Sequence, residues 1–217
     1  MEAATRVIPE DPLCFLSRLA IKLNTLWLMS TYPFASFGKR VSIHYSCDIQ
    51  RPLSKYISLG DRVCLAPDVW LSALPGSEGF ETKIVLGSGC LIGRRSMISA
   101  RNRIVLEADV LLSPSVLIMD HNHKYSDPDT PIHSQGTTDG GTITVGQNCW
   151  LGYGAAILCN SGSLTVGRNS VIGANAVVTR SVPPYSVVAG NPARVIRKYE
   201  PQAGRWVTVP SEDSVSE

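Results

Sequence analysis

A six-residue phrase recurs through most of this chain and leaves few folds open to it. The phrase comes in pairs of hexads, for example "LGSGCLIGRRSM" and "VGRNSVIGANAV". Most hexads have an aliphatic first residue, a small second residue and a small or β-branched fifth residue. The pairs begin at Leu59, Leu86, Leu106, Val145 and Val166. The fifth positions are Val63, Val69, Cys90, Ser96, Val110, Val116, Cys149, Ala155, Ser170 and Ala176.

A period of six is too short for a helical hairpin and does not match a heptad repeat. It fits a short strand followed by a turn, so that three hexads close one triangular coil of about 18 residues. The aliphatic residues then point inward and stack on those of the coils above and below. Small residues fit the tight corners, where Gly, Asn and Asp tolerate unusual backbone angles. The pattern therefore predicts an all-β parallel β-helix of about six or seven turns.

The spacing between the pairs shows where this regular coil is interrupted. Successive pairs are separated by 27, 20, 39 and 21 residues, which is one coil plus an insertion in each case. The largest insertion contains "MDHNHKYSDPDTPIHSQG", and a smaller one, "ALPGSEGFETK", covers residues 73–83. Functional groups are often carried on such excursions from a rigid scaffold. We therefore expect the functional site at the loop 119–142.

The two ends of the chain depart from the repeat. Residues 13–29 are apolar except for a polar stripe that includes Arg18 and Lys22, which predicts an amphipathic helix in an N-terminal segment 1–37. These mid-segment charges argue against a signal peptide or a membrane-spanning helix. The helix could cap the coil, or it could contact a membrane surface or a partner. We assign residues 38–198 to the β-helix domain and residues 199–217 to a polar tail, exposed or disordered.

The net charge argues against nucleic acid as a partner, and the cysteines favour a reducing compartment. The formal net charge is only +2 over 217 residues, so no strong field points to nucleic acid. The six cysteines form no CxxC pair and no Cys/His zinc spacing, which favours reduced, buried thiols. We expect a cytoplasmic protein, or one peripheral to the inner membrane face.

Three motifs carry a family resemblance: "LSPSVLIMDHNH", "ITVGQNCWLGYGA" and "VGRNSVIGANAVVTRSVPPYSVVAGNPARVIRKY". Residues 86–198 resemble the hexapeptide-repeat acyltransferases, in the branch of galactoside, maltose and exopolysaccharide O-acetyltransferases. The resemblance implies a left-handed parallel β-helix with an extended or helical C-terminal segment. It also implies a homotrimer in which acetyl-CoA, as co-substrate, lies in the cleft between subunits. An acetyl group would then pass from acetyl-CoA to a saccharide hydroxyl.

The resemblance places the general base of this reaction at His121. A sugar hydroxyl is a weak nucleophile at neutral pH, so a side chain must take its proton as it attacks the thioester. The thioester already supplies a good leaving group, and we expect no metal. His123 remains an alternative base. We expect Asp120, Asn122 and His123 to orient the base or bind the acceptor. Arg94 stands where the family commonly has an asparagine one coil before the base.

Two other histidines have no such role. We expect His133 to shape the loop and His44 to lie outside the site. For the cofactor, the resemblance implies a groove in which small residues admit the pantetheine arm and arginines pair with phosphates. The groove residues implied are Trp150, Gly152, Tyr153, Ala174, Thr179, Arg180 and Arg197.

Two rival functions remain open at this point. A zinc hydrolyase of the γ-carbonic anhydrase kind uses the same coil and three histidines, for which His121, His123 and His133 are candidates. A non-catalytic β-helix would need no polar loop. For an acetyltransferase the acceptor is open among free sugars, lipid-linked saccharides, nucleotide sugars and antibiotics. The apolar N-terminal helix favours a cell-surface or lipid-linked saccharide. O-transfer and N-transfer, and acetyl and longer acyl donors, are not separated by the motifs.

Overall fold

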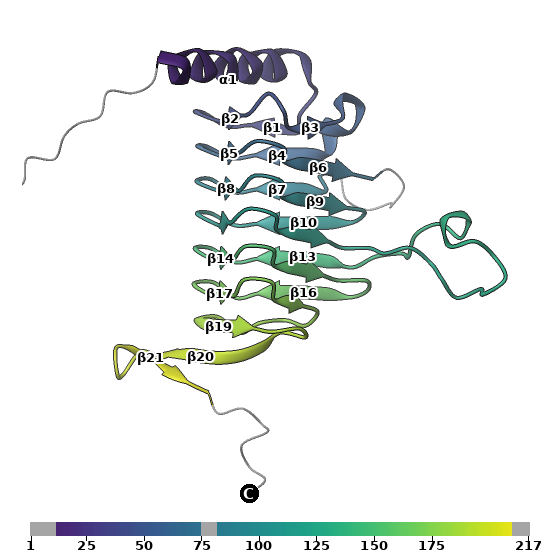
Figure 1. Ribbon diagram of the computed structural model, residues 1–217, viewed down its shortest axis with the longest axis vertical. Coiled ribbons are helices and arrows are strands. Elements are labelled where there is room, and N and C mark those ends of the chain that lie inside the picture. The colour runs from purple at the N-terminus through teal and green to yellow at the C-terminus, as the bar shows by residue number, and fades with distance from the viewer. Residues whose placement is uncertain (1–11, 75–81, 210–217) are drawn as a thin grey trace, which may run out of the picture.

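A computed structural model describes residues 12–74 and 82–209, and it shows a triangular column of short parallel strands (Figure 1). Each turn of the chain contributes one strand to each of three sheets. The first sheet contains β1 (Ser36–Phe37), β4 (Ile57–Leu59), β7 (Ile84–Leu86), β10 (Arg103–Leu106), β13 (Thr142–Val145) and β16 (Ser163–Val166). The predicted parallel β-helix is therefore confirmed.

The other two sheets continue each turn. The second sheet contains β2 (Ser42–Ile43), β5 (Cys64–Leu65), β8 (Leu91–Ile92), β11 (Leu111–Leu112), β14 (Trp150–Leu151), β17 (Val171–Ile172), β19 (Ser186–Ala189), β20 (Arg194–Glu200) and β21 (Arg205–Thr208). The third sheet contains β3 (Asp48–Ile49), β6 (Trp70–Ala73), β9 (Met97–Ala100), β12 (Leu117–Met119), β15 (Ala156–Leu158) and β18 (Val177–Val178). Two 3₁₀ helices, η1 (Arg51–Tyr56) and η2 (Ile132–Ser134), lie in the connections.

The strand register follows the hexad phase. Along the first sheet the paired residues are the starts of the five predicted hexad pairs, namely Leu59, Leu86, Leu106, Val145 and Val166. Each of these side chains is at most 1% exposed, as expected for residues that stack inside the coil. One further coil precedes them, because Phe37 of β1 pairs with Leu59. The predicted domain, residues 38–198, includes most of that coil, although none of the five hexad pairs lies in it.

The corners between the first and second sheets use left-handed backbone conformations. Asn148 and Asn169 have φ of 55° there, and the equivalent Gly89 has φ of 79°. The backbone N–H of each of these three residues donates to a carbonyl of the preceding coil, at 2.8–3.0 Å. Asn and Gly tolerate this conformation better than other residues do. The side chains of Asn148 and Asn169 also share a hydrogen bond of 2.8 Å.

Small polar side chains at the fifth hexad position close the corners from inside. The Cys90 thiol donates to the carbonyl of Glu107 at 3.0 Å, and the Cys149 thiol donates to the carbonyl of Gly167 at 3.1 Å. Burial raises the pKa of Cys90 to about 11, which keeps this thiol protonated and unreactive at neutral pH. All six cysteines are free, and Cys14 is exposed.

The two ends of the column are closed differently. Helix α1 (Pro12–Thr31) covers the predicted helical region and lies across the N-terminal end of the column (Figure 1). In the described part of the chain, no helix is long and apolar enough to cross a membrane. At the other end β20 pairs antiparallel with both β19 and β21.

The tail predicted from residue 199, exposed or disordered, is largely exposed, but as far as residue 208 it is ordered. Strand β20 runs through Tyr199, and the hairpin with β21 continues to Thr208. The Tyr199 ring packs against Tyr185 and Trp206, at centroid distances of 6.2 and 5.6 Å, so aromatic contacts hold the hairpin. The extended alternative for the C-terminal segment is thus the one observed. Residues 1–11, residues 75–81 of the smaller insertion and residues 210–217 of the tail lie outside the described residues.

Candidate active site

The histidine loop leaves the third sheet after β12 and rejoins the first sheet at β13 (Figure 1). Its predicted limits, residues 119 and 142, coincide with the end of β12 and the start of β13. The loop projects from one corner of the column, and both of its ends remain packed on the coil, with Asp120 and His121 at the start and Gly141 at the finish buried. At the base of the loop, a site would therefore be held by the rigid end of β12, and the loop would supply its polar groups.

Asp120 and His121 form a buried pair at the base of this loop. Asp120 is fully buried, and its Oδ1 lies 3.0 Å from Nδ1 of His121. The same carboxylate accepts the backbone N–H groups of Arg101 at 2.7 Å and Asn102 at 2.9 Å. A carboxylate so held can only accept from the ring, so Nδ1 of His121 carries the proton. The lone pair of Nε2 is then available to take a proton from a substrate.

The residue one coil before His121 is not the predicted one. Met119 pairs with Ser99, so continuing the register places Arg101 beside His121. Arg94 instead lies at the corner between the second and third sheets, where its carbonyl accepts the N–H of Ser115. The prediction that Arg94 precedes the base by one coil is therefore wrong. Arg94 is 27 residues before His121, whereas the pairing of β9 with β12 makes one coil 20 residues long at this point.

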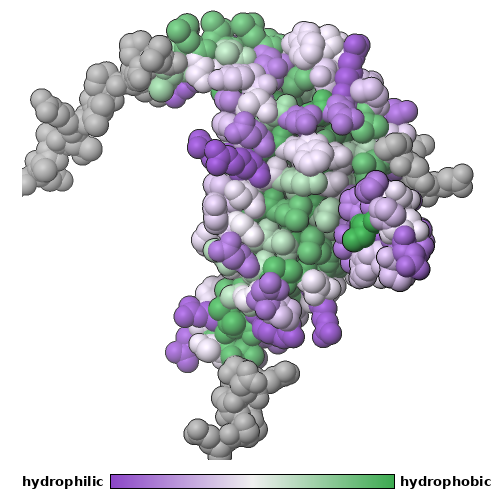
Figure 2. All heavy atoms as spheres, turned by 45° about the vertical axis from the view of Figure 1, so that its right-hand side comes forward, coloured by the Kyte–Doolittle hydropathy of each residue, from purple (hydrophilic) through white to green (hydrophobic). Residues whose placement is uncertain are grey.

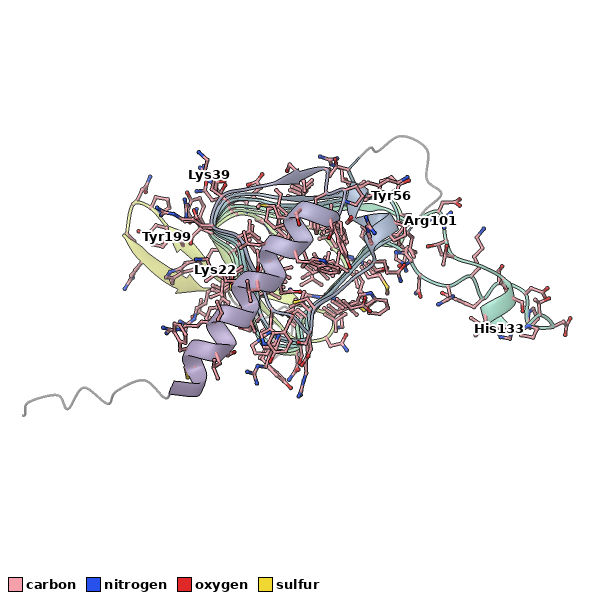
Figure 3. The ribbon with its side chains drawn as sticks, turned by 90° about the horizontal axis from the view of Figure 1, so that it is seen from above. Lys22, Lys39, Tyr56, Arg101, His133 and Tyr199 are labelled. Carbon is pink, nitrogen blue, oxygen red and sulfur yellow. The ribbon has the colours of Figure 1, made fainter. Side chains whose placement is uncertain are left out.

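The remaining histidines separate from the pair. His123 is exposed, and its backbone N–H donates to Oδ1 of Asn122 at 2.9 Å. His133 is exposed in η2, and Figure 3 shows it at the far end of the loop from Arg101. His44 pairs with Ser46 at 2.9 Å on another corner. Within residues 12–74 and 82–209, no three His, Cys, Asp or Glu side chains gather as they would around a metal ion.

A cavity of about 320 Å³ opens at the end of the third sheet, near the base of the loop, and neither Asp120 nor His121 is part of its wall. Asn122, the neighbour of His121, lines it together with Thr179 and Arg180, two residues predicted to bind the cofactor. The rest of the wall is Met119, Leu158, Cys159, Asn160, Ser161, Ser163 and Leu164. The structure thus brings one part of the predicted site together in a single chain.

The other predicted cofactor residues lie on a different corner. Trp150 and Tyr153 are 48% and 56% exposed between the second and third sheets, and Nε1 of Trp150 donates to Oγ of Ser113 at 2.9 Å. Gly152 lies so close to the next coil that a Cβ there would come within 2.8 Å of the Ala174 nitrogen. Arg197 is exposed on β20. In one chain these four residues and Ala174, the fifth of the remaining predicted cofactor residues, are not part of the wall of the cavity lined by Asn122 and Arg180.

Sequence reasoning missed a buried lysine beneath the pair. Lys83 is 1% exposed, and its Nζ donates to the carbonyls of Leu74 at 2.6 Å and Arg101 at 2.7 Å. The ammonium also lies 5.4 Å from the centroid of the Tyr56 ring. Lys83 therefore holds the carbonyl of Arg101, the residue whose N–H holds Asp120. No motif marks it, because a lysine before a hexad is ordinarily solvated.

The lysine gives stability a distinct pH dependence. Burial lowers the pKa of Lys83, partly offset by the charge of Asp120. Between the lowered pKa and the unperturbed 10.5, the unfolded chain binds more protons than the folded chain, so this residue makes stability rise with pH. We expect the unfolding free energy of the wild type, relative to Lys83→Met, to increase as the pH approaches 10.5. Urea unfolding at several pH values measures the difference, and a constant or falling difference would contradict it.

Comparison with known proteins agrees with this architecture. Residues 142–180, which include β13–β18, match the hexapeptide repeat of succinyl-transferase. Residues 142–180 of this chain therefore match a hexapeptide repeat. The resemblance predicted from the three motifs is thereby confirmed.

The hexapeptide-repeat chain is also similar to proteins named as sugar acetyltransferases. It is 34% identical over 115 residues to a putative lipopolysaccharide biosynthesis O-acetyl transferase of Escherichia coli (strain K12), covering 50% of this chain and 57% of that protein. It is 33% identical over 147 residues to the galactoside O-acetyltransferase of the same organism, covering 66% of this chain and 64% of that protein. The chain thus spans about 60% of the length of these two relatives.

A solved structure shares the fold. The N-acyltransferase AntD from Bacillus cereus, in complex with dTDP and 3-hydroxybutyryl-CoA, superposes with a TM-score of 0.67 at 20% identity. The match covers 82% of this chain and 90% of that one. At this identity the likeness establishes the coil architecture of the hexapeptide-repeat chain and no more.

Proposed function

We propose that this chain is a CoA-dependent O-acetyltransferase that moves an acetyl group from acetyl-CoA to a hydroxyl of a saccharide. The observation that carries the proposal is the buried Asp120–His121 pair at the base of the loop, near a cavity whose wall includes Asn122 and Arg180. The names of the relatives, and the acyl-CoA held by the AntD structure, support the same reaction class. No other cofactor is needed, because the thioester is already activated.

The pair supplies the proton chemistry of this reaction. Nε2 of His121 takes the proton of the acceptor hydroxyl while the hydroxyl oxygen attacks the thioester carbonyl carbon. Asp120 holds the Nδ1–H and stabilises the imidazolium that forms. When the tetrahedral intermediate collapses, the C–S bond breaks, and the imidazolium returns the proton to the departing CoA sulfur. His121 is therefore the proposed base, and exposed His123 is left to contact the acceptor.

The split of the predicted residues between two corners supports a homotrimer. One corner carries His121, Asn122 and Arg180, and another carries Trp150 and Tyr153. A groove between adjacent subunits would join the first corner of one subunit to the second corner of its neighbour. Arg94 lies on that second corner and belongs with the proposed CoA groove. The left-handed sense of the coil, implied by the family resemblance, is part of this proposal.

The proposal is tested by thiol release from acetyl-CoA with a panel of free, nucleotide-linked and lipid-linked saccharides. We expect release that depends on a saccharide hydroxyl, and a particle of three times 23.4 kDa by light scattering. Arg180→Ala should weaken CoA binding by roughly tenfold in calorimetry, because a charge-assisted contact to phosphate is lost. Arg205→Ala, an exposed arginine on β21, is the matched control.

Three outcomes would contradict this function. One is the absence of CoA binding at millimolar concentration. Another is transfer to amino sugars alone, which would make the enzyme an N-acyltransferase. The third is a fully active monomer, which would contradict the shared site but not the chemistry of the pair.

A further inference from the structure

Helix α1 is docked specifically on the end of the coil. Its inner face buries Thr25 and Leu28, and the Thr25 hydroxyl accepts the backbone N–H of Ile43 at 2.9 Å. Nδ2 of Asn24 donates to the Ile43 carbonyl at 3.2 Å. These contacts fix the rotation of α1 about its own axis. The sequence therefore determines which side chains lie on the face of α1 that is directed away from the coil.

The outer face of α1 is apolar where a surface helix is ordinarily polar. Leu16, Leu19, Leu23, Leu26 and Trp27 are each between 43% and 59% exposed. Figure 2 shows hydrophobic side chains gathered over the helix at that end of the molecule. Because the helix lies across the column, this face forms the end of the described structure (Figure 1). A flat surface could therefore contact the helix along its length.

A groove of about 690 Å³ runs between α1 and the first coil, and its chemistry is amphipathic. Ile21, Leu26, Met29, Phe37 and Val41 supply apolar wall. Its remaining residues include four cations and no carboxylate: Arg18, Lys22, Lys39 and Arg40. Figure 3 shows Lys22 and Lys39 on the same side of α1, one from the helix and one from a corner of the coil.

We propose that α1 and this groove dock the protein on the surface of an anionic phospholipid bilayer. The helix lies parallel to the membrane, its outer leucines and Trp27 enter the acyl region, and the four cations meet lipid phosphates. Charge complementarity favours this occupant, because four cations line the groove beside the apolar face, and a bilayer surface is anionic at its headgroups and apolar beneath them. The proposal goes beyond the acetyl transfer proposed above and does not depend on it.

The number of basic residues and of α1 helices at the membrane also predicts how the affinity for an anionic membrane changes. Each basic residue near an anionic surface strengthens binding roughly fivefold, and salt screens this contribution. In the proposed trimer, three α1 helices would lie at the same end of three parallel columns. They would contact one membrane together, and their contributions would combine through avidity.

Vesicle co-sedimentation of the full chain tests the proposal. The vesicles are phosphatidylcholine alone, or phosphatidylcholine with phosphatidylglycerol, each at low and high salt. We expect binding to anionic vesicles that weakens at high salt. Leu23→Glu should abolish it, and Lys22→Glu should weaken it by about tenfold or more. Ile132→Glu is the matched control, because Ile132 is 56% exposed and Leu23 is 57% exposed.

Several results would overturn the proposal. No vesicle binding by the wild type would do so, as would equal loss in Leu23→Glu and Ile132→Glu. Equal binding to neutral and anionic vesicles would remove the role of the cations. If the wild type does not bind vesicles and Leu23→Glu reduces the molecular mass in light scattering, the outer face of α1 is a contact between copies of the chain. Acetyl transfer measured on a water-soluble saccharide separates any of these failures from failure of the proposed function.

Discussion

His121→Ala is expected to lower kcat by roughly 10²–10⁴, the usual contribution of a positioned general base. The imidazole acts on the acceptor hydroxyl through Nε2, so the affinity for CoA should hardly change. Steady-state kinetics with a true acceptor, together with CoA calorimetry, measure both effects.

His123→Ala is the matched control for that substitution. His123 lies two residues away in the same loop, but its side chain is exposed, and its backbone N–H donates to Oδ1 of Asn122. We expect a small loss, or mainly a raised KM for the acceptor if the ring positions substrate. If His121→Ala keeps full kcat while His123→Ala abolishes it, the two roles are exchanged. If neither variant loses activity, the reaction takes place elsewhere.

Asp120→Asn is expected to lower kcat by about 10²–10⁴, because it reverses the tautomer of His121. The amide oxygen would accept from the N–H of Arg101 or Asn102, and the amide nitrogen would then donate to Nδ1. Nδ1 could no longer carry the proton, so Nε2 would be protonated and unable to act as a base. CoA affinity should stay near that of the wild type. Kinetics and CoA calorimetry measure the two quantities.

Asp127→Asn controls for the loss of a loop carboxylate. Asp127 is exposed in the same loop, where it accepts the hydroxyl of Thr130 at 2.7 Å, away from the buried pair. Its substitution should leave kcat within about twofold, since exposed polar contacts contribute little. The double variant Asp120→Asn/His121→Ala should be no worse than His121→Ala alone, because the two residues act as one unit. Additive losses would show that Asp120 acts independently of the ring.

Much of the scaffold followed from the sequence because coil stacking repeats one local requirement. Every sixth residue must be aliphatic and point inward, so the start of each hexad pair can be found by counting residues along the chain. This count predicted that the following residues stack on one another in successive coils: Leu59, Leu86, Leu106, Val145 and Val166. The loop 119–142 was predictable for the same reason, since it is the segment that breaks the count. The first coil, near Phe37, lies almost entirely within the predicted domain 38–198, but no hexad pair marks it because its hexads depart from the repeat.

The order of the tail up to residue 208 was not predictable, for a different reason. Its residues are polar in composition, and Tyr199 and Trp206 give no periodic signal. Their contact exists only after β20 turns back on β19 and brings the rings together. A short antiparallel hairpin at the edge of a sheet is stabilised by such cross-strand pairs, which composition does not reveal.

The sequence by itself therefore determined the repeat, the coil and the loop that carries His121, because each depends on residues close together in the chain. Only the tertiary structure decided which residues meet at the site. Arg101 and Lys83 reach the Asp120–His121 pair because neighbouring coils stack about 5 Å apart, whatever the number of residues between them. The same stacking moved Arg94 and Trp150 to another corner, since a corner is set by where each strand ends and not by hexad count alone.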